Sequence, residues 1–341
     1  MNKKLSENRN LAKDIISAGG DVSPLIIPAE LTDSWALTNP SVVVVDGEII
    51  VNLRAVEYTL IHSDKTQKYW SRWGPLTYCH AENMAALKTI NFLCRLNKET
   101  LEVEKYAKID TSKFDIPPVW EFHGLEDCRL ANWDGKLYGI GVRRDVKPNG
   151  EGRMQYQEID YSFEGESYAK EVSRNRIQAP IDLASYCEKN WMPILEMPDH
   201  FVKWSNPTEV VRANKDGSSV QTRLGSKFIS IGTDIRGGTQ LIKWGEGWLA
   251  ITHELELMRA QNDFGYKDSF YFNRFVYWNS NFEIEKTSDS FSFIDARIEF
   301  VTGMDHLDDD NVIATFGAAD SGGFVTRIPK TLINNLLTTT W

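Results

Sequence analysis

"HGLEDCRLANWDGKLYGIGVRRD", residues 123–145, places two runs of alternating apolar residues on either side of Asp134-Gly135. Asp-Gly between two such runs is a strong signal for a β-hairpin with a two-residue turn. An acidic pair, Glu126 and Asp127, precedes the first run, and Arg129 follows two residues later. The stretch therefore predicts a hairpin whose first strand carries a cluster of charged side chains.

Four other stretches repeat this layout. They are "SVVVVDGEIIVNLRAV" (41–56), "TQLIKWGEGWLAITHE" (239–254), "NVIATFGAADSGGFVTRI" (311–328) and, more weakly, "WMPILEMPDHFVKWSNPTEVVR" (191–212). Five hairpin units spaced roughly fifty to ninety residues apart are typical of a degenerate array of β-sheet blades. We predict an all-β fold, a five-bladed β-propeller with a short N-terminal helix and minor helical insertions.

Two helices are predicted from apolar spacing. The first twenty residues place Leu11, Ile15 and Ile16 on one helical face, ahead of a stop at Gly19-Gly20. A second helix is predicted over residues 81–96, "AENMAALKTINFLCRL". No linker or low-complexity stretch divides the chain, so we expect an N-terminal helical extension over 1–30 and one propeller domain over 31–341.

Composition excludes several classes of protein. The 341 residues have a formal net charge of -10, which argues against a nucleic-acid partner, and no apolar run is long enough to cross a bilayer. No secretory signal begins the sequence, so a cytoplasmic location without a membrane partner is expected. Four cysteines and the histidines show no metal-ligand spacing, so we expect no metal site.

Polar residues of the different units are expected to meet, because the innermost strands of a propeller line one central channel. The candidate site residues are Asn39, Arg54, Glu126, Asp127, Arg129, Lys189, Asn190, Trp191, Arg236, His253 and Asp320.

Each candidate has a functional and a structural interpretation. Asp127 is either a general acid tuned by its charged neighbours or half of a structural ion pair with Arg129. Arg54 either binds an anion or a sugar hydroxyl, or reaches water at a strand end. Lys189 either holds an anion beside a sugar or belongs to a loop around a buried Trp191. A histidine such as His253 after an apolar run is more often a satisfied core residue.

Five stretches together resemble a known family. They are "NPSVVVVDGEIIVNLR", "GLEDCRLANWDGKLYGI", "EKNWMP", "RGGTQLIKWGEGWLAITHE" and "GMDHLDDDNVIATFGAAD", and in this order they resemble the blade motifs of glycoside hydrolase family 130 and its relatives. That group comprises β-mannoside phosphorylases, mannosidases and related mannosyltransferases. The resemblance covers about residues 36–330 and implies a five-bladed propeller with its active site in the central channel.

The resemblance also implies roles. Asp127 matches the aspartate of the family's EDPR motif, the general acid of an inverting mechanism, and Arg129 matches its arginine. Asn39 and Arg54 match residues that hold the mannosyl unit. The remaining assignments are Glu126, Asn190 and Trp191 to the sugar, and Lys189, Arg236, His253 and Asp320 to phosphate or a leaving group.

Departures from the family pattern concern the attacking group. Cys128 replaces the proline of the motif, and "WSNP", with Ser205 and Asn206, stands where phosphorylases carry an arginine. Loss of one cation weakens the case for phosphate, since a dianion needs several positive groups, although Arg236 is a candidate substitute. If water attacks instead, Glu299 or Glu254 would be required as the base.

Three functions follow as hypotheses, all with an oligosaccharide or sugar as partner. The first is an inverting β-mannoside-active enzyme without a cofactor, for which inorganic phosphate is a candidate co-substrate. The second is a glycosyltransferase using a nucleotide-sugar such as GDP-mannose. The third is a non-catalytic carbohydrate-binding propeller that uses Trp35, Trp73 and Trp191 as stacking platforms. Association into a homo-oligomer stays open.

Overall fold

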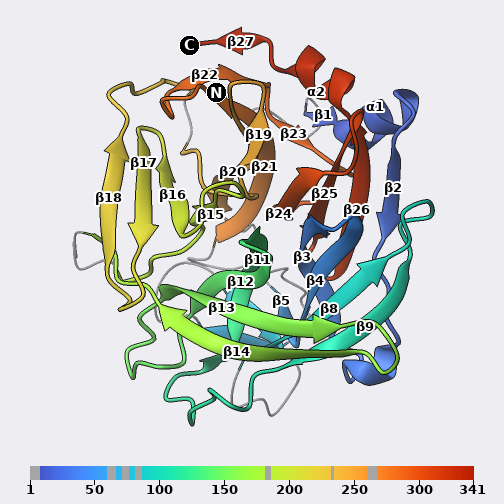
Figure 1. Cartoon of the computed structure of the whole chain (residues 1–341), viewed down its shortest axis with the longest axis vertical. Coiled ribbons are helices and arrows are strands. Elements are labelled where there is room, and N and C mark those ends of the chain that lie inside the picture. Colours follow the sequence, from blue (N-terminus) through green and yellow to red (C-terminus); the bar gives the residue numbers. More distant parts are fainter. Residues whose placement is uncertain are drawn as a thin grey trace.

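The computed structural model describes residues 8–59, 67–70, 77–80, 87–180, 186–231, 234–259 and 267–341. Strands form nearly all of its regular structure, so the all-β class expected from the sequence is confirmed. The sheets stand side by side around a common centre, a propeller-like arrangement (Figure 1). Trp73 and residues 81–86 of the predicted second helix lie outside the described residues.

The largest sheet runs in the order β11-β12-β13-β14-β9-β8-β4-β3, with β10 paired to β8. Its strands are β3 (Ala36–Val45), β4 (Glu48–Val56), β8 (Leu87–Leu96), β9 (Val103–Asp110), β10 (Phe122–His123), β11 (Leu125–Trp133), β12 (Lys136–Arg143), β13 (Arg153–Ser162) and β14 (Tyr168–Arg176). Only two residue pairs, Ala169 with Ile109 and Lys170 with Asp110, join its two halves through β14 and β9.

Three further sheets complete the ring around the centre. The first contains β15 (Met192–Pro193), β16 (His200–Ser205), β17 (Thr208–Ala213) and β18 (Ser219–Leu224). The second contains β1 (Arg9–Asn10), β19 (Ile242–Trp244), β20 (Gly247–Arg259), β21 (Lys267–Trp278), β22 (Ile284–Thr287), β23 (Phe291–Ser292) and β27 (Thr339–Thr340). The third contains β2 (Asp21–Pro24), β24 (Glu299–His306), β25 (Asn311–Ala318) and β26 (Gly322–Pro329).

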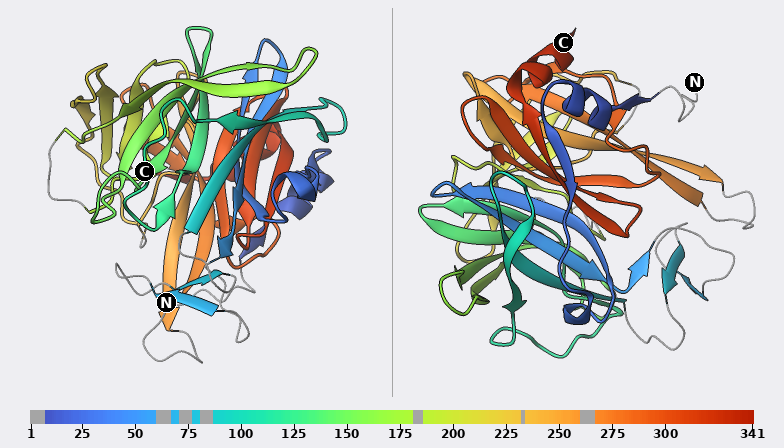
Figure 2. Two further views of the ribbon diagram at one scale, coloured as in Figure 1. Left: turned by 90° about the horizontal axis from the view of Figure 1, so that it is seen from below. Right: turned by 90° about the vertical axis from the view of Figure 1, so that its right-hand side faces the viewer.

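A small separate sheet contains β5 (Tyr58–Thr59), β6 (Gln67–Trp70) and β7 (Thr77–His80). It projects from the same side of the molecule as the far end of the long β20–β21 hairpin, as both views of Figure 2 show. These two projections lie outside the ring of sheets.

All five predicted hairpins are present. The turns at Asp46-Gly47 and Asp134-Gly135 have positive φ at both central residues, with values of 48°, 79°, 52° and 74°. Two left-handed residues give the turn a twist that matches the right-handed twist of the paired strands, which explains why Asp-Gly marks both sites.

The helix predicted over 81–96 is wrong, because residues 87–96 form strand β8. β8 lies between β4 and β9, and Phe92, Leu93 and Cys94 are all buried. A strand that is covered on both faces carries a continuous run of apolar residues instead of an alternating pattern. Such a run cannot be distinguished from a buried helix by its spacing.

The N-terminal helix is present but shorter than expected, as α1 (Leu11–Ser17). Leu11 and Ile15 are buried, whereas Ile16 points outward with 62% of its surface exposed. β2 then pairs with β26 as the fourth strand of its sheet. The expected boundary between an N-terminal extension (1–30) and the propeller domain (31–341) stays a prediction.

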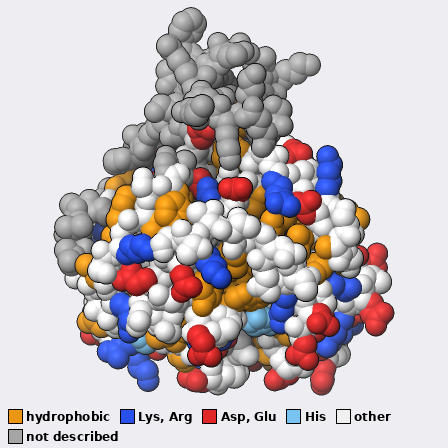
Figure 3. Space-filling view, turned by 90° about the horizontal axis from the view of Figure 1, so that it is seen from above, with side chains coloured by type: hydrophobic (Ala, Val, Ile, Leu, Met, Phe, Trp, Pro, Cys, Tyr) orange, Lys and Arg blue, Asp and Glu red, His pale blue; other side chains and the backbone are white. Residues whose placement is uncertain are grey.

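The remaining helical pieces are a 3-10 turn (Ala29–Leu31) and α2 (Lys330–Leu336). Neither α-helix in the described part of the chain is long and apolar enough to span a membrane. On the face seen in Figure 3, basic and acidic side chains are interspersed rather than gathered by sign.

Gln240, two residues before β19, joins the largest sheet to the sheet of β24 at the centre. Its fully buried amide nitrogen donates to the carbonyl oxygens of Val42 on β3 (2.9 Å) and Leu130 on β11 (2.5 Å). Its amide oxygen accepts from the backbone N–H of Met304 on β24 (2.9 Å). One side chain thus satisfies backbone groups of three strands that are distant in sequence, which fixes their spacing at the axis.

We expect Gln240→Leu to lower the free energy of unfolding by about 3 kcal/mol, because it leaves buried backbone groups without partners. Urea denaturation measures the loss. Gln178→Leu, at an exposed position, is the matched control and should change stability by less than about 0.5 kcal/mol. Equal effects of the two substitutions would contradict the joining role of Gln240.

Candidate active site

A cavity of about 90 Å³ collects residues from all five hairpin units. Its lining contains every predicted site residue except Arg129 and Trp191. The full lining is Asn39, Arg54, Tyr58, Glu126, Asp127, Lys189, Asn190, Arg236, His253, Tyr271, Ile298, Phe300 and Asp320.

Left-handed backbone presents four of these side chains. Asn39, Asp127, Asn190 and Asp320 have φ values of 43°, 51°, 62° and 50°. Asn and Asp tolerate this region best among residues with a side chain. The strand register also shifts between Thr38 and Ser41 on β3 and between Glu126 and Arg129 on β11, so Asn39 and Asp127 lie in bulges that turn them out of the normal alternation.

The carboxylate of Asp127 is held by two neighbours. Its Oδ1 accepts hydrogen bonds from Nη1 of Arg54 (2.6 Å) and Nδ2 of Asn39 (2.8 Å). The hydroxyl of Thr38 donates to Oδ1 of Asn39 (3.0 Å), which orients the Asn39 amide with its nitrogen toward Asp127. The two strands of the β3–β4 hairpin therefore fix a carboxylate of the distant strand β11 at the cavity.

Arg54 is almost completely buried and fully engaged. Besides Asp127, it donates to the hydroxyls of Tyr58 (2.6 Å) and Thr89 (3.1 and 3.2 Å), and it lies 3.7 Å from Glu126. Burial lowers its pKa, but Tyr58 and the surrounding carboxylates outweigh burial and raise the pKa above its ordinary value. Its structural interpretation as a strand-end arginine reaching water is excluded by an exposed fraction of 4%.

The two adjacent carboxyl groups differ in their pKa. Burial raises the pKa of Asp127, but Arg54, Lys189 and the Asn39 amide outweigh burial, and the pKa falls below its ordinary value. Burial raises the pKa of Glu126 above its usual range, against the opposing effect of Arg54 and Arg144. Oε1 of Glu126 is buried without a hydrogen-bond partner among the described residues. Asp127 is thus an ionised carboxylate, whereas Glu126 holds its proton more firmly.

Arg129 lies behind the cavity, where it is fully buried. Its Nε donates to the carbonyl oxygen of Gly238 (2.6 Å), and its Nη1 donates to that of Asp127 (2.9 Å). The guanidinium also lies over the ring of Phe300, with 5.6 Å to the centroid. Arg129 therefore braces the backbone at Asp127, and the alternative of a side-chain ion pair between them is not observed.

His253 lines an aromatic wall of the cavity. Its ring stacks on Tyr271 (5.5 Å between centroids) and meets Phe300 edge-on (4.7 Å). Burial, together with Arg129, Arg236 and Lys189, lowers the pKa of His253 to about 3, so the ring is neutral at physiological pH. Its Nδ1 is buried without a partner among the described residues, which leaves it available to a ligand.

Lys189 and Arg236 supply positive charge to the same cavity. The Lys189 side chain is exposed, and Arg236, 36% exposed, lies 3.8 Å from Asp234. Ser205 and Asn206 do not line the cavity, so Arg236 is the residue that adds a second accessible cation there.

Three predicted roles do not fit the structure. Trp191 is fully buried against Phe201, so its ring cannot stack on a sugar. Glu299 is buried, and its carboxylate accepts backbone N–H groups of Phe293, Ile294 and Ala296. Glu254 pairs with Arg274 (2.5 Å). Neither glutamate lines the cavity, and both serve local structure instead of acting as a base.

Four lining residues were missed from sequence: Tyr58, Tyr271, Ile298 and Phe300. Tyr271 lies on β21 near the register partner of His253, which is Asn273. The sequence does not show how long the β20–β21 hairpin is, so no sequence pattern predicts that Tyr271 lies beside His253. No group of His, Cys, Asp and Glu within the described ranges could hold a metal ion.

Acid should destabilise the fold through His253. In the unfolded chain the imidazole binds a proton near pH 6.5, whereas the folded protein takes none until about pH 3, so stability is lost as the pH falls through this window. The slope contributed by one such group is up to about 1.4 kcal/mol per pH unit. Urea denaturation at pH 6 and pH 4.5 should show a smaller pH dependence for His253→Gln than for the native chain. The same dependence in both would contradict burial of a neutral imidazole.

No protein-family model matches the chain, and no curated protein matches it by sequence. Solved structures do match. A β-1,2-mannobiose phosphorylase from Listeria innocua superposes with a TM-score of 0.54 at 14% identity, over 89% of this chain and 92% of the other.

Two proteins of Bacteroides superpose comparably. A putative glycosidase from Bacteroides thetaiotaomicron gives a TM-score of 0.55 at 12% identity, over 87% of each chain. A putative glycoside hydrolase from Bacteroides ovatus gives 0.54 at 14% identity, over 90% of this chain and 89% of the other. The chain thus shares the fold of mannoside phosphorylases and putative glycoside hydrolases, and the resemblance seen in its motifs is confirmed at the level of fold.

Proposed function

We propose that the protein is a carbohydrate-active enzyme that cleaves β-mannosides with inversion, as a glycosidase or phosphorylase. The observation that carries the proposal is the meeting of Asn39, Arg54 and Asp127 in one cavity with Lys189 and Arg236. Residues that match the family's motifs converge in space although the chain shares only 14% identity with the mannobiose phosphorylase of the same fold.

The propeller is proposed to have five blades. The two halves of the largest sheet, β3-β4-β8-β9 and β11-β12-β13-β14, are each antiparallel, and the path between them passes through only two residue pairs, between β14 and β9. Counted separately, they form five blades with the sheets around β17, β20 and β25. Each blade then contributes at least one residue to the cavity.

The sugar would be held by the polar groups at Asp127. Asn39 and Arg54 already position that carboxylate, and a mannosyl unit offers hydroxyls that can donate to it and accept from the guanidinium. The aromatic edge at Tyr271 and Phe300 supplies an apolar wall for the ring carbons.

Proton donation needs both carboxyl groups. Asp127 matches the family's general acid, but in the free protein it is ionised by Arg54. Glu126, with its raised pKa and unpartnered oxygen, is the group that retains a proton in this cavity. We therefore propose that Glu126 stores the proton and that Asp127 relays it toward the leaving oxygen. When the surroundings move the pKa values of two neighbouring carboxyl groups in opposite directions, one group holds the proton and the other stays ionised.

Phosphate is the attacking group that the cations favour. Lys189 and Arg236 would hold hydrogen phosphate, whose oxygen forms a bond to the anomeric carbon as the glycosidic bond breaks. The leaving oxygen takes the stored proton, and the proton released by hydrogen phosphate restores the acid. No further base is needed, in keeping with the absence of Glu254 and Glu299 from the cavity.

The test of this proposal is incubation with β-1,2-mannobiose, with and without phosphate. Mannose 1-phosphate formed only with phosphate would establish phosphorolysis, and free mannose in both reactions would establish hydrolysis. Release of GDP from GDP-mannose would favour the glycosyltransferase, and binding of mannobiose without turnover would favour the non-catalytic alternative. Either of these last two results overturns the proposal.

Asp127→Asn should lower turnover by about 10² to 10⁴-fold, the usual contribution of acid–base catalysis, while the protein stays folded. Asparagine keeps the left-handed backbone and can still accept from Arg54. Asp134→Asn is the matched control, since it changes an aspartate with the same backbone conformation at the other end of β11. Initial rates on mannobiose measure both, and full activity in Asp127→Asn would remove it from the mechanism.

The pH dependence of kcat/KM should identify where the proton is held, because its alkaline limb reports the pKa of the essential acid in the free enzyme. With the proton on Glu126, activity should decline above pH 4.5, the ordinary glutamate value that burial raises. Glu126→Gln should remove this limb. A limb below pH 3.8, in the lowered range of Asp127, would show that Asp127 alone holds the proton.

A further inference from the structure

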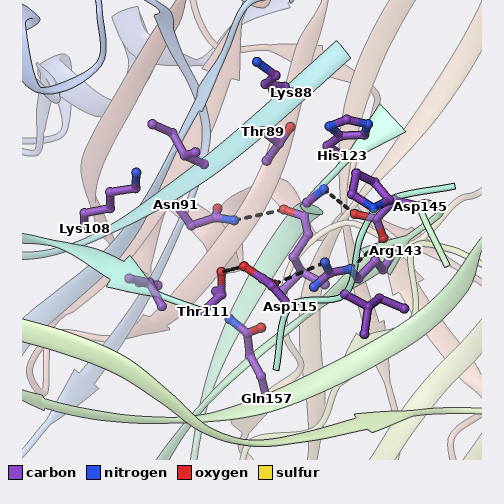
Figure 4. A pocket seen from close by; sticks show the side chains of 16 residues that line it. Lys88, Thr89, Asn91, Lys108, Thr111, Asp115, His123, Arg143, Asp145 and Gln157 are labelled. Atoms are coloured by element: carbon purple, nitrogen blue, oxygen red, sulfur yellow. Dashed lines mark hydrogen bonds and ion pairs between the residues drawn. The ribbon is translucent and has the colours of Figure 1, made fainter. Parts of the chain in front are cut away.

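The cavity between the two halves of the largest sheet measures about 340 Å³, and its carboxylates are already paired. Asp145 accepts from Nε of Arg143 (2.7 Å) and from the backbone N–H of Gly124 (2.9 Å). Asp115 accepts from the hydroxyl of Thr111 (2.7 Å), and it lies 3.4 Å from Nη2 of Arg143. Figure 4 shows these pairs inside the pocket. The carboxylates of this cavity therefore serve the fold.

A different cavity, of about 380 Å³, lies where α2 meets the sheet of β19 to β22. Its volume is in the range of small-ligand pockets. It shares no lining residue with the candidate active site. The full lining is Trp244, Gly245, Tyr277, Glu285, Lys286, Asn334 and Leu337.

The strand register puts the side chains of this cavity on one face of the sheet. Leu249 on β20 pairs with Ile242 on β19 and with Tyr277 on β21. Tyr277 pairs in turn with Lys286 on β22. Directly paired residues of antiparallel strands share a face. Trp244, two residues after Ile242, lies on that same face because side chains alternate along a strand.

A β-bulge adds Glu285 to this face. The register of β21 and β22 shifts between Tyr277 and Trp278, which leaves Glu285 as the extra residue of β22. In such a bulge two residues of one strand oppose a single residue of the other, so Glu285 and Lys286 both lie opposite Tyr277. Burial and the nearby carboxylate of Glu285 raise the pKa of the Tyr277 hydroxyl, in keeping with this arrangement.

Two aromatic rings form walls of the cavity. The Trp244 ring lies parallel to the imidazole of His306, with 6.1 Å between centroids, and its indole N–H donates to Oδ1 of Asn334 (3.2 Å). The Tyr277 ring packs against Gly247, where a Cβ would lie only 2.7 Å from the tyrosine hydroxyl oxygen. These contacts hold both rings in place, and each ring is partly exposed.

Polar groups around the cavity are uncommitted. The carboxylate of Glu285, the ammonium group of Lys286 and the Tyr277 hydroxyl make no hydrogen bond or salt bridge with another residue in the described part of the chain. The amide oxygen of Asn334 accepts from Trp244, but its amide nitrogen donates to none of the described residues. The lining thus offers donors, an acceptor and a hydroxyl, with one charge of each sign.

This combination fits a neutral saccharide. A lining with balanced charge does not select an ionic ligand. A sugar hydroxyl both donates and accepts, so neighbouring hydroxyls can bond to a carboxylate and to an ammonium group at once. Flat aromatic faces cover the ring carbons of a sugar.

We propose that this cavity is a binding site for a neutral saccharide. Glu285 and Lys286 bind neighbouring hydroxyls of the sugar, and the amide nitrogen of Asn334 binds a third. Trp244 and Tyr277 contact the carbon skeleton. This site does not depend on the function proposed for the candidate active site.

Isothermal titration calorimetry on the full chain tests the site. The neutral probes are β-1,2-mannobiose, cellobiose and maltose, and the charged probes are digalacturonate and the disaccharide of glucosamine. The chain carries Asp127→Asn so that a disaccharide in the first cavity is not consumed during the titration. At least one neutral disaccharide should bind in a manner that requires Glu285 and Lys286, and the charged disaccharides should bind there about tenfold more weakly or less.

Glu285→Ala/Lys286→Ala should weaken the binding of that neutral disaccharide by about tenfold or more, as expected for lost hydrogen bonds to charged groups. Lys98→Ala/Glu99→Ala is the matched control, because it removes a neighbouring pair of opposite charges outside the cavity, and it should leave binding unchanged. Tyr277→Phe keeps the ring and should weaken binding about threefold. Binding of no neutral disaccharide, equal effects of the two double variants, or equally tight binding of a charged disaccharide through Glu285 and Lys286 would each overturn the proposal.

Discussion

The buried guanidinium of Arg129 is the interaction on which the candidate active site depends. No carboxylate in the described part of the chain forms a salt bridge with it, and backbone carbonyl oxygens from the β11 bulge and from Gly238 satisfy it instead. Burial lowers its pKa to about 10, which still leaves it charged at physiological pH. Because these carbonyls belong to segments about a hundred residues apart, a single side chain sets the distance between Asp127 and the strand that carries His253.

Much of the fold was visible in the sequence because its signals are local. Asp-Gly turns between apolar runs mark their hairpins without reference to the rest of the chain, and the structure contains all five. The site residues could be assembled because a repeated architecture brings equivalent strand ends together. The failures have one origin in burial: β8 resembles a helix because both faces are covered, and Trp191 was assigned to a ligand although the core surrounds it.

Other features had no local signal. The aromatic wall at Tyr271 and Phe300 depends on the register of a long hairpin, and the opposite pKa shifts of Glu126 and Asp127 depend on which of them lies closer to Arg54. A cavity of about 340 Å³ arises where the two halves of the largest sheet diverge, which no single stretch encodes.

We propose that mannose occupies the cavity formed around Asp127. A crystal structure of the protein soaked with mannose tests it most directly. We expect a pyranose ring in that cavity, with ring hydroxyls within hydrogen-bonding distance of Asp127 and Arg54 and with Lys189 and Arg236 beside the anomeric carbon. Mannose bound elsewhere on the molecule, with the Arg54–Asp127 pair untouched by sugar, would contradict it.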